Sequence, residues 1–149
     1  MIFIFLSFLV ILLDQATKYI VKTQMKPYES FPVLKPILYI TYVKNRGAAF
    51  SIFEGKIIFF TVISLIVTSI ILFYLIKGPK DLYITKFSLA LILGGTVGNL
   101  LDRIRLGYVI DFIDLRIWPV FNMADTFIVV GVLLLSYILI FEKENVKIF

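Results

Sequence analysis

The chain contains no cysteine and no histidine, and only ten of its 149 residues are acidic. Without cysteine there is no disulfide, no thiolate nucleophile and no cysteine-ligated metal. Without histidine, a zinc site would depend on carboxylates alone, an uncommon ligand set, so we expect no metal or other cofactor. If the chain is an enzyme, Asp and Asn must supply nearly all of its polar chemistry.

Charge is also scarce, since 17% of the residues are charged whereas 60% are hydrophobic and the mean hydropathy is +1.00. A soluble domain is typically about 45–50% apolar, so this composition predicts an integral membrane protein. The net charge of +5 suits contact with anionic lipid headgroups. The Lys and Arg residues form no dense tract, so we expect membrane lipids and no nucleic acid among the partners.

Four segments have nearly the 20 apolar residues that a membrane-spanning helix needs, at about residues 2–21, 57–76, 82–101 and 122–141. They predict an all-α membrane protein with four transmembrane helices, forming a single domain over residues 1–149. No Lys or Arg precedes the first apolar segment and no small-residue cleavage site follows it. We therefore expect a retained span there and no cleavable signal peptide.

The first loop, residues 22–56, is too long for a simple connector. It contains a β-branched and aromatic stretch at 37–43, a turn-like segment at 44–47 and a second apolar stretch at 48–53. This pattern is typical of a β-hairpin, which we expect to form a small extramembrane β region on the membrane surface.

Four spans place the first and third loops on one side of the membrane and both termini on the other. The ends of the first and third spans and the start of the fourth also face the loop side. We therefore expect one face to gather most of the polar residues: Asp14, Lys18, Asn45, Asn99, Asp102, Arg103, Asp111, Asn122 and Asp125. In the third span, Gly94 and Gly98 form a small-xxx-small pair that predicts close helix packing.

Asp111 and Asp125 each interrupt a strongly apolar context. An acid within a span costs roughly 2.5–3.5 kcal/mol at the helix centre and less near the interface, which makes such residues functional candidates. Two adjacent carboxyl groups share a proton near neutral pH, because one pKa rises and the other falls. Such a pair can activate water with one member while the other hydrogen-bonds to a carbonyl oxygen, which is the chemistry of peptide hydrolysis.

Several ordered blocks resemble the lipoprotein signal peptidase (signal peptidase II) family, the aspartic peptidases of bacterial inner membranes. They are DQATK at 14–18, NRGAAFS at 45–51, GGTVGNLLDR at 94–103, GYVIDF at 107–112 and FNMAD at 121–125. The resemblance spans nearly the whole chain, and it implies that Asp111 and Asp125 are the catalytic dyad.

The resemblance also implies a substrate and a location. The substrate would be a prolipoprotein that carries diacylglycerol on a cysteine, cut on the N-terminal side of that cysteine. The enzyme, expected to be a monomer, would lie in the bacterial inner membrane with its active site on the extracytoplasmic side. Other family positions would support the dyad or contact the substrate: Asp14, Lys18, Asn45, Gly47, Asn99, Asp102, Arg103 and Asn122.

Each candidate also has a structural interpretation. Asp111 could be a solvated loop acid, as we expect Asp114 to be, and Asp125 could be an N-terminal helix charge. Asn122 could cap the fourth helix or hold the carboxylate and the substrate backbone. Asn45 could be only a turn residue, or its hairpin could present backbone groups to an extended peptide.

The remaining polar candidates could likewise have a structural or a functional role. Asp14 and Lys18 lie four positions apart, which predicts an intrahelical ion pair. Asn99 and Arg103 could belong to a structural network in which Arg103 pairs with Asp102 or a neighbouring acid. We expect Arg105 and Arg116 to be interfacial anchors.

The sequence leaves two alternatives to a peptidase and one conflict over orientation. A proton-coupled transporter could use intramembrane acids as relay sites, but no acid lies near the middle of a span and no inverted repeat is seen. A non-catalytic scaffold would leave the clustered acids unexplained. The orientation is a separate question. The first and third loops contain more Lys and Arg than the opposite side, so the positive-inside rule predicts a cytoplasmic site. The family has its site on the other side of the membrane, and we follow the family.

Overall fold

The computed structural model describes residues 1–47, 55–79 and 82–141. Its four helices are α1 (Ile2–Gln24), α2 (Ile57–Lys77), α3 (Tyr83–Leu106) and α4 (Met123–Phe141). All four are long and apolar enough to cross a membrane, which confirms the four predicted spans. The chain is thus a multi-pass membrane protein. The first and third helices run beyond their predicted ends, to Gln24 and Leu106.

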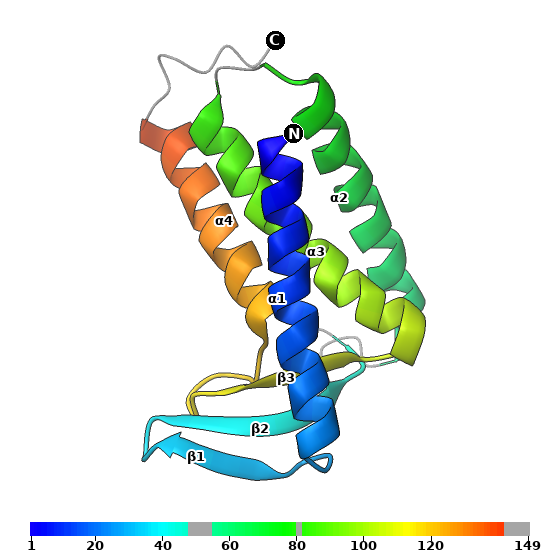
Figure 1. Cartoon of the computed structure of the whole chain (residues 1–149), viewed down its shortest axis with the longest axis vertical. Helices are drawn as coiled ribbons and strands as arrows, with labels where there is room; N and C mark the ends of the chain where they lie inside the picture. The colour runs from blue at the N-terminus through cyan, green and yellow to red at the C-terminus, as the bar shows by residue number, and fades with distance from the viewer. Residues whose placement is uncertain (48–54, 80–81, 142–149) are drawn as a thin grey trace.

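The central helix is α3, which packs against α1, α2 and α4 (Figure 1). Its most apolar window is 72% buried inside the protein, whereas the corresponding windows of the other helices are 11–28% buried. Gly94 faces Val10 and Gly98 faces Asp14, and a Cβ atom at either glycine would lie within 2.6 Å of that neighbour. The predicted small-residue packing face is therefore present, and the other helices turn their apolar surface outward.

A three-stranded antiparallel sheet lies at one end of the helices (Figure 1). Its strands are β1 (Ser30–Leu34), β2 (Leu38–Asn45) and β3 (Val109–Asp114), with β2 in the middle. The predicted strand over 37–43 is confirmed as β2, but it pairs with β1 before it and with β3 from the third loop. The predicted returning arm over 48–53 lies outside the described residues.

The sheet stays next to the helices because its central side chains are apolar and buried. Tyr42 of β2 and Ile110 and Phe112 of β3 form one cluster with Val21 from the last turns of α1. Figure 1 shows the sheet beside the end of α1 and the start of α4, while the N-terminus lies at the opposite end. The predicted gathering of polar residues at one end of the molecule follows from this arrangement.

Candidate active site

Asp111 lies in β3, and its side chain points inward with 2% exposure. The register of the sheet pairs Val43 with Asp111 and Asn45 with Val109, which places Asn45 and Asp111 diagonally on the same face. Both carboxyl oxygens of Asp111 accept amide hydrogen bonds. Asn45 Nδ2 donates to Oδ2 at 2.8 Å, and Asn122 Nδ2 donates to Oδ1 at 2.6 Å.

Asp125 lies in the first turn of α4, where its oxygens accept from two asparagines. Asn99 Nδ2 donates to Oδ1 at 2.7 Å, and the backbone N–H of Asn122 donates to Oδ2 at 3.2 Å. In return, Asn122 Oδ1 accepts from the backbone N–H of Asp125 at 2.9 Å. This reciprocal pair is a capping box. Asn122 therefore caps the helix and also holds both carboxyl groups, whereas its predicted contact with the substrate backbone stays a prediction.

The two acids line one cavity of about 360 Å³. Asn45, Gly47, Asn99 and Arg103 line it as well, so six of the ten predicted site residues surround the same space. The loop before α4 supplies further lining residues that the sequence did not indicate: Trp118, Pro119, Val120 and Phe121. The position of the only Trp of the chain, between the two acids, was the one available signal. Among the described residues, no cluster of three or more metal-ligating side chains is present.

Burial and the adjacent charge of Asp125 raise the pKa of the Asp111 carboxyl from its ordinary value of 3.8 to about 7. The hydrogen bonds from Asn45 and Asn122 act in the opposite direction, because they stabilise the ionised form. Asp111 therefore holds a proton up to neutral pH. A buried carboxyl that shares its cavity with a second acid is the arrangement expected of a proton-sharing pair.

The remaining predicted residues lie behind the cavity and form a buried ion cluster around Lys18, which is 2% exposed. Lys18 Nζ lies 2.9 Å from Asp14 Oδ2 and 3.0 Å from Asp102 Oδ2, so the predicted intrahelical pair is confirmed and has a third member. The ammonium also donates to Asn99 Oδ1 at 2.9 Å. Since Asn99 in turn holds Asp125, Lys18 is one residue removed from the candidate dyad.

The ion cluster joins four elements through backbone groups. The N–H of Ala124 in α4 donates to Asp14 Oδ1 at 2.9 Å, and the N–H of Ile110 in β3 donates to Asp102 Oδ2 at 3.2 Å. Gln15 completes the cluster by donating to Asp102 Oδ1 at 3.0 Å. Gln15 lies within the block at 14–18 but is not among the predicted site residues. Its position next to Asp14 was the only hint of this role.

The predicted ion pair between Arg103 and Asp102 or a neighbouring acid is not seen among the described residues. Asp102 is engaged by Lys18, and Arg103 forms no ion pair within residues 1–47, 55–79 and 82–141. Its guanidinium lies 5.5 Å from the centre of the Phe60 ring of α2, at the wall of the cavity. A positive charge is thus available beside both acids.

The prediction that Asp114 is a solvated acid is wrong, because this residue is 6% exposed. Thr41 Oγ1 donates to Asp114 Oδ2 at 2.7 Å, and the backbone N–H of Arg116 donates to Oδ1 at 2.9 Å. The Arg116 guanidinium lies 3.7 Å from the centre of the Tyr39 ring and 3.6 Å from Asp114. Asp114 therefore fastens the end of β3 to β2, away from the cavity.

Comparisons with known proteins agree with this architecture. Residues 6–141 match the family model described as signal peptidase (SPase) II. The lipoprotein signal peptidase of Caldanaerobacter subterraneus subsp. tengcongensis is 50% identical over 135 residues, which cover 89% of this chain and 92% of that protein. The lipoprotein signal peptidase of Moorella thermoacetica is 47% identical over 135 residues, which cover 91% of this chain and 90% of that protein. A bacterial membrane enzyme solved by the in meso method at 2.3 Å superposes with a TM-score of 0.88 at 36% identity, covering 97% of this chain and 90% of that one.

Proposed function

This chain belongs to the signal peptidase II family and is a membrane peptidase, and from that premise we propose that Asp111 and Asp125 form the catalytic dyad of an aspartic endopeptidase. The observation that carries the proposal is their meeting at one cavity through Asn122. Its side chain donates to Asp111 at 2.6 Å, and its backbone donates to Asp125 at 3.2 Å. Asn122 thus holds both acids at one cavity, an arrangement in which they would share a proton.

In the proposed reaction, the ionised carboxylate takes a proton from a water molecule as its oxygen attacks the carbonyl carbon of the scissile peptide bond. The protonated carboxyl donates a hydrogen bond to the carbonyl oxygen. Collapse of the tetrahedral intermediate breaks the C–N bond, and a proton from the pair passes to the leaving amine. The products are a carboxylic acid, which then releases its proton to water, and an amine, and the pair again holds one proton. We leave the two roles unassigned, since the pair titrates as a unit.

The proposed substrate is a prolipoprotein whose cysteine carries diacylglycerol, cut on the N-terminal side of that cysteine. The names of the curated relatives support this substrate class. A second cavity of about 380 Å³ also supports it, because it shares Asp125 with the first and has an almost wholly apolar lining. An acyl chain would fit such a surface, which would keep the scissile bond at the lipid–water boundary.

The supporting residues have proposed roles of two kinds. Asn45, Gly47 and Arg103 would contact the substrate, because they line the cavity. Asp14, Lys18, Asp102, Asn99 and Asn122 would position the dyad through the hydrogen bonds described above. We further propose that the enzyme works as a monomer in the bacterial inner membrane, with the cavity on the extracytoplasmic side.

The decisive experiment compares purified Asp111→Asn and Asp125→Asn with the wild type on a diacylglyceryl-modified precursor and on its unlipidated twin. Each variant should lose about a thousandfold or more of the cleavage rate, since neither amide can exchange the catalytic proton. Asp114→Asn is the matched control, because it changes a buried acid of the same strand outside the cavity. Thermal melting of each variant verifies the fold. Full activity of either dyad variant would refute the mechanism, and equal cleavage of both precursors would refute the substrate class.

A further inference from the structure

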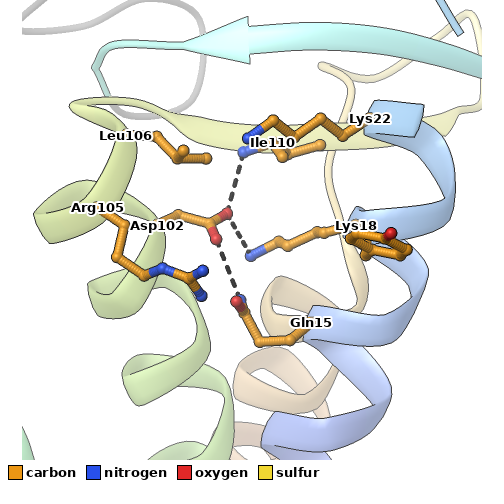
Figure 2. Close-up of a pocket in the computed structure, with 8 residues that line it drawn as sticks. Gln15, Lys18, Lys22, Asp102, Arg105, Leu106 and Ile110 are labelled. Atoms are coloured by element: carbon orange, nitrogen blue, oxygen red, sulfur yellow. Dashed lines mark hydrogen bonds and ion pairs between the residues drawn. The ribbon is translucent and has the colours of Figure 1, made fainter.

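A second polar cavity lies on the other side of the ion cluster from the candidate dyad. It is about 260 Å³ in volume and lies between the last turns of α1 and α3, with Ile110 of β3 beside it (Figure 2). None of its lining residues lines the dyad cavity. We call it the α1–α3 cavity.

The charges around the α1–α3 cavity are unbalanced. Lys18 and Asp102 line its inner wall, but Lys18 already pairs with both Asp102 and Asp14 in the ion cluster. The two other cations, Lys22 and Arg105, form no ion pair within the part of the chain that the structure describes. Figure 2 shows Lys22 extending from α1 toward β3 and Arg105 extending from α3 toward Gln15. Two cations that have no ion-pair partner among the described residues therefore meet at the same small space from two helices.

The position of the cavity at the helix ends is where we expect the phosphates of a bilayer to lie. It is formed by the ends of two membrane-spanning helices, just before the sheet begins. Tyr19 at its edge is 68% exposed, and its neighbours Ile20 and Ile104 are 58% and 62% exposed on the outer surface of α1 and α3. An exposed Tyr between apolar residues and a polar helix end is typical of the membrane–water interface.

We propose that the α1–α3 cavity binds the phosphate group of an anionic membrane lipid. Arg105 can donate two parallel hydrogen bonds to a phosphate, which suits the planar guanidinium, and Lys22 adds a second charge. Tyr19 supplies a hydroxyl at the same cavity, whereas Gln15 Nε2 already donates to Asp14, Gly98 and Asp102. The acyl chains of the lipid would lie along the exposed apolar surface beside Tyr19.

This ligand differs in chemistry from the proposed peptidase substrate. A diacylglyceryl group on cysteine has no phosphate and no charge, so it gives Lys22 and Arg105 nothing to bind. An anionic lipid is favoured over phosphatidylcholine, because the choline group would bring a positive charge close to both side chains. Basic pockets between transmembrane helices bind anionic headgroups by this principle.

The test uses the full chain in nanodiscs of phosphatidylcholine with and without phosphatidylglycerol, and native mass spectrometry counts the lipids that stay bound. The wild type should retain phosphatidylglycerol over phosphatidylcholine by about tenfold. Lys22→Gln/Arg105→Gln should lose this preference. Lys26→Gln is the matched control, since it removes a Lys from the same side of the protein outside the cavity. Lys22→Arg/Arg105→Lys, which retains both charges, should keep most of the preference.

A parallel arm adds inorganic phosphate to the phosphatidylcholine discs at constant ionic strength and follows the melting temperature. A rise in the wild type and not in Lys22→Gln/Arg105→Gln would support a phosphate site and identify the free ion as a ligand. The proposal is overturned if the wild type shows no lipid preference and no response to phosphate. It is equally overturned if the doubly neutralised variant keeps the full preference. If that variant does not fold, the single variants Lys22→Gln and Arg105→Gln decide, and each should reduce the preference.

Discussion

Asn122 is fully buried and forms hydrogen bonds with both candidate catalytic acids. Its Nδ2 also donates to Asn99 Oδ1 at 3.1 Å, so every polar atom of its side chain has a partner. A fully satisfied buried amide is rigid, because any rotation would leave a donor or acceptor without a partner. Asn122 thus couples the start of α4 to the orientation of Asp111.

The raised pKa of Asp111 predicts the pH dependence of cleavage. Asp111 keeps its proton up to about pH 7, and the proposed reaction needs one proton on the pair. The rate should therefore fall as the pH rises through about 7, where the pair becomes doubly ionised. The hydrogen bond from Asn45 lowers this pKa, so Asn45→Ala should shift the alkaline decline to higher pH. Profiles of kcat/KM on the lipidated precursor measure both effects.

Thr41→Val is the control for this shift. Thr41 lies on the same strand as Asn45, but its hydroxyl donates to Asp114 and not to Asp111. The cleavage rate of Thr41→Val should decline at the same alkaline pH as that of the wild type. An Asn45→Ala profile that moves to lower pH, or does not move, would contradict the assigned role of Asn45.

At the scale of single residues, the sequence selected Asp111 and Asp125, which the structure brings to one cavity, but the prediction for Asp114 was wrong. Both acids of β3 follow an isoleucine in a run of apolar residues, so local composition does not separate them. The strand separates them, because residues three apart on a strand point to opposite faces. Asp111 points to the cavity, and Asp114 points to Thr41 and Arg116. That distinction needed the strand assignment, which the sequence reasoning did not make.

Among the elements, the contact between α3 and the start of α4 is the tightest that bears on the site. A Cβ atom on Gly95 would collide with the carbonyl oxygen of Ala124, which is backbone and cannot rotate away. Gly95→Ala should therefore push the first turn of α4, and Asp125 with it, away from Asn99. We expect a loss of roughly 1–3 kcal/mol in stability together with a large fall in cleavage rate.

Thermal melting and cleavage of the lipidated precursor check this prediction, with Ile104→Ala as the control. Ile104 lies on the same helix and is 62% exposed, so its truncation should change little. A Gly95→Ala protein with wild-type melting and activity would show that α4 can shift without disturbing the dyad.

The helices were predictable and the sheet was only partly so. A span is defined by its own hydropathy, whereas a strand depends on its partners. Strand β2 was recognised from its β-branched and aromatic residues. Its partner β3 comes from another loop, across about 66 positions at the Asn45–Asp111 contact. The acids in β3 break the apolar pattern that would have marked it as a strand. Contacts of such long sequence separation leave no local signal.

For the whole molecule, the side of the membrane on which the cavity lies is the prediction most open to test. The first and third loops and the adjoining ends of α1 and α3 carry Lys22, Lys26, Lys35, Lys44, Arg46, Arg103, Arg105 and Arg116, against Lys77, Lys80, Lys86, Lys143 and Lys147 on the other side. Several of the former have a role in the fold: Arg103 lies over Phe60, Lys44 over Tyr108 and Arg116 over Tyr39. We therefore expect the family orientation, with an extracytoplasmic cavity.

Reporter fusions after Lys80 and at the C-terminus measure the orientation. Both positions should be cytoplasmic, so green fluorescent protein should fluoresce there and alkaline phosphatase should stay inactive. Active phosphatase at both positions would place the dyad in the cytoplasm, as the positive-inside rule alone predicts. A fusion after Lys44 is the internal comparison, and its reporters should behave in the opposite way.

The ion cluster around Lys18 has a consequence for how the protein is made. The first helix leaves the ribosome with Lys18 and Asp14 already four residues apart and able to pair. The acceptor on Asn99 is 81 positions later, and the amide of Ala124 that completes Asp14 is 110 positions after that acid. We therefore expect the Asp14–Lys18 ion pair to enter the membrane before Asn99 and Ala124, its later hydrogen-bond partners, have been synthesised. The proposed dyad is complete only when the last helix, which carries Asp125, arrives, so we expect a half-made chain to have no peptidase activity.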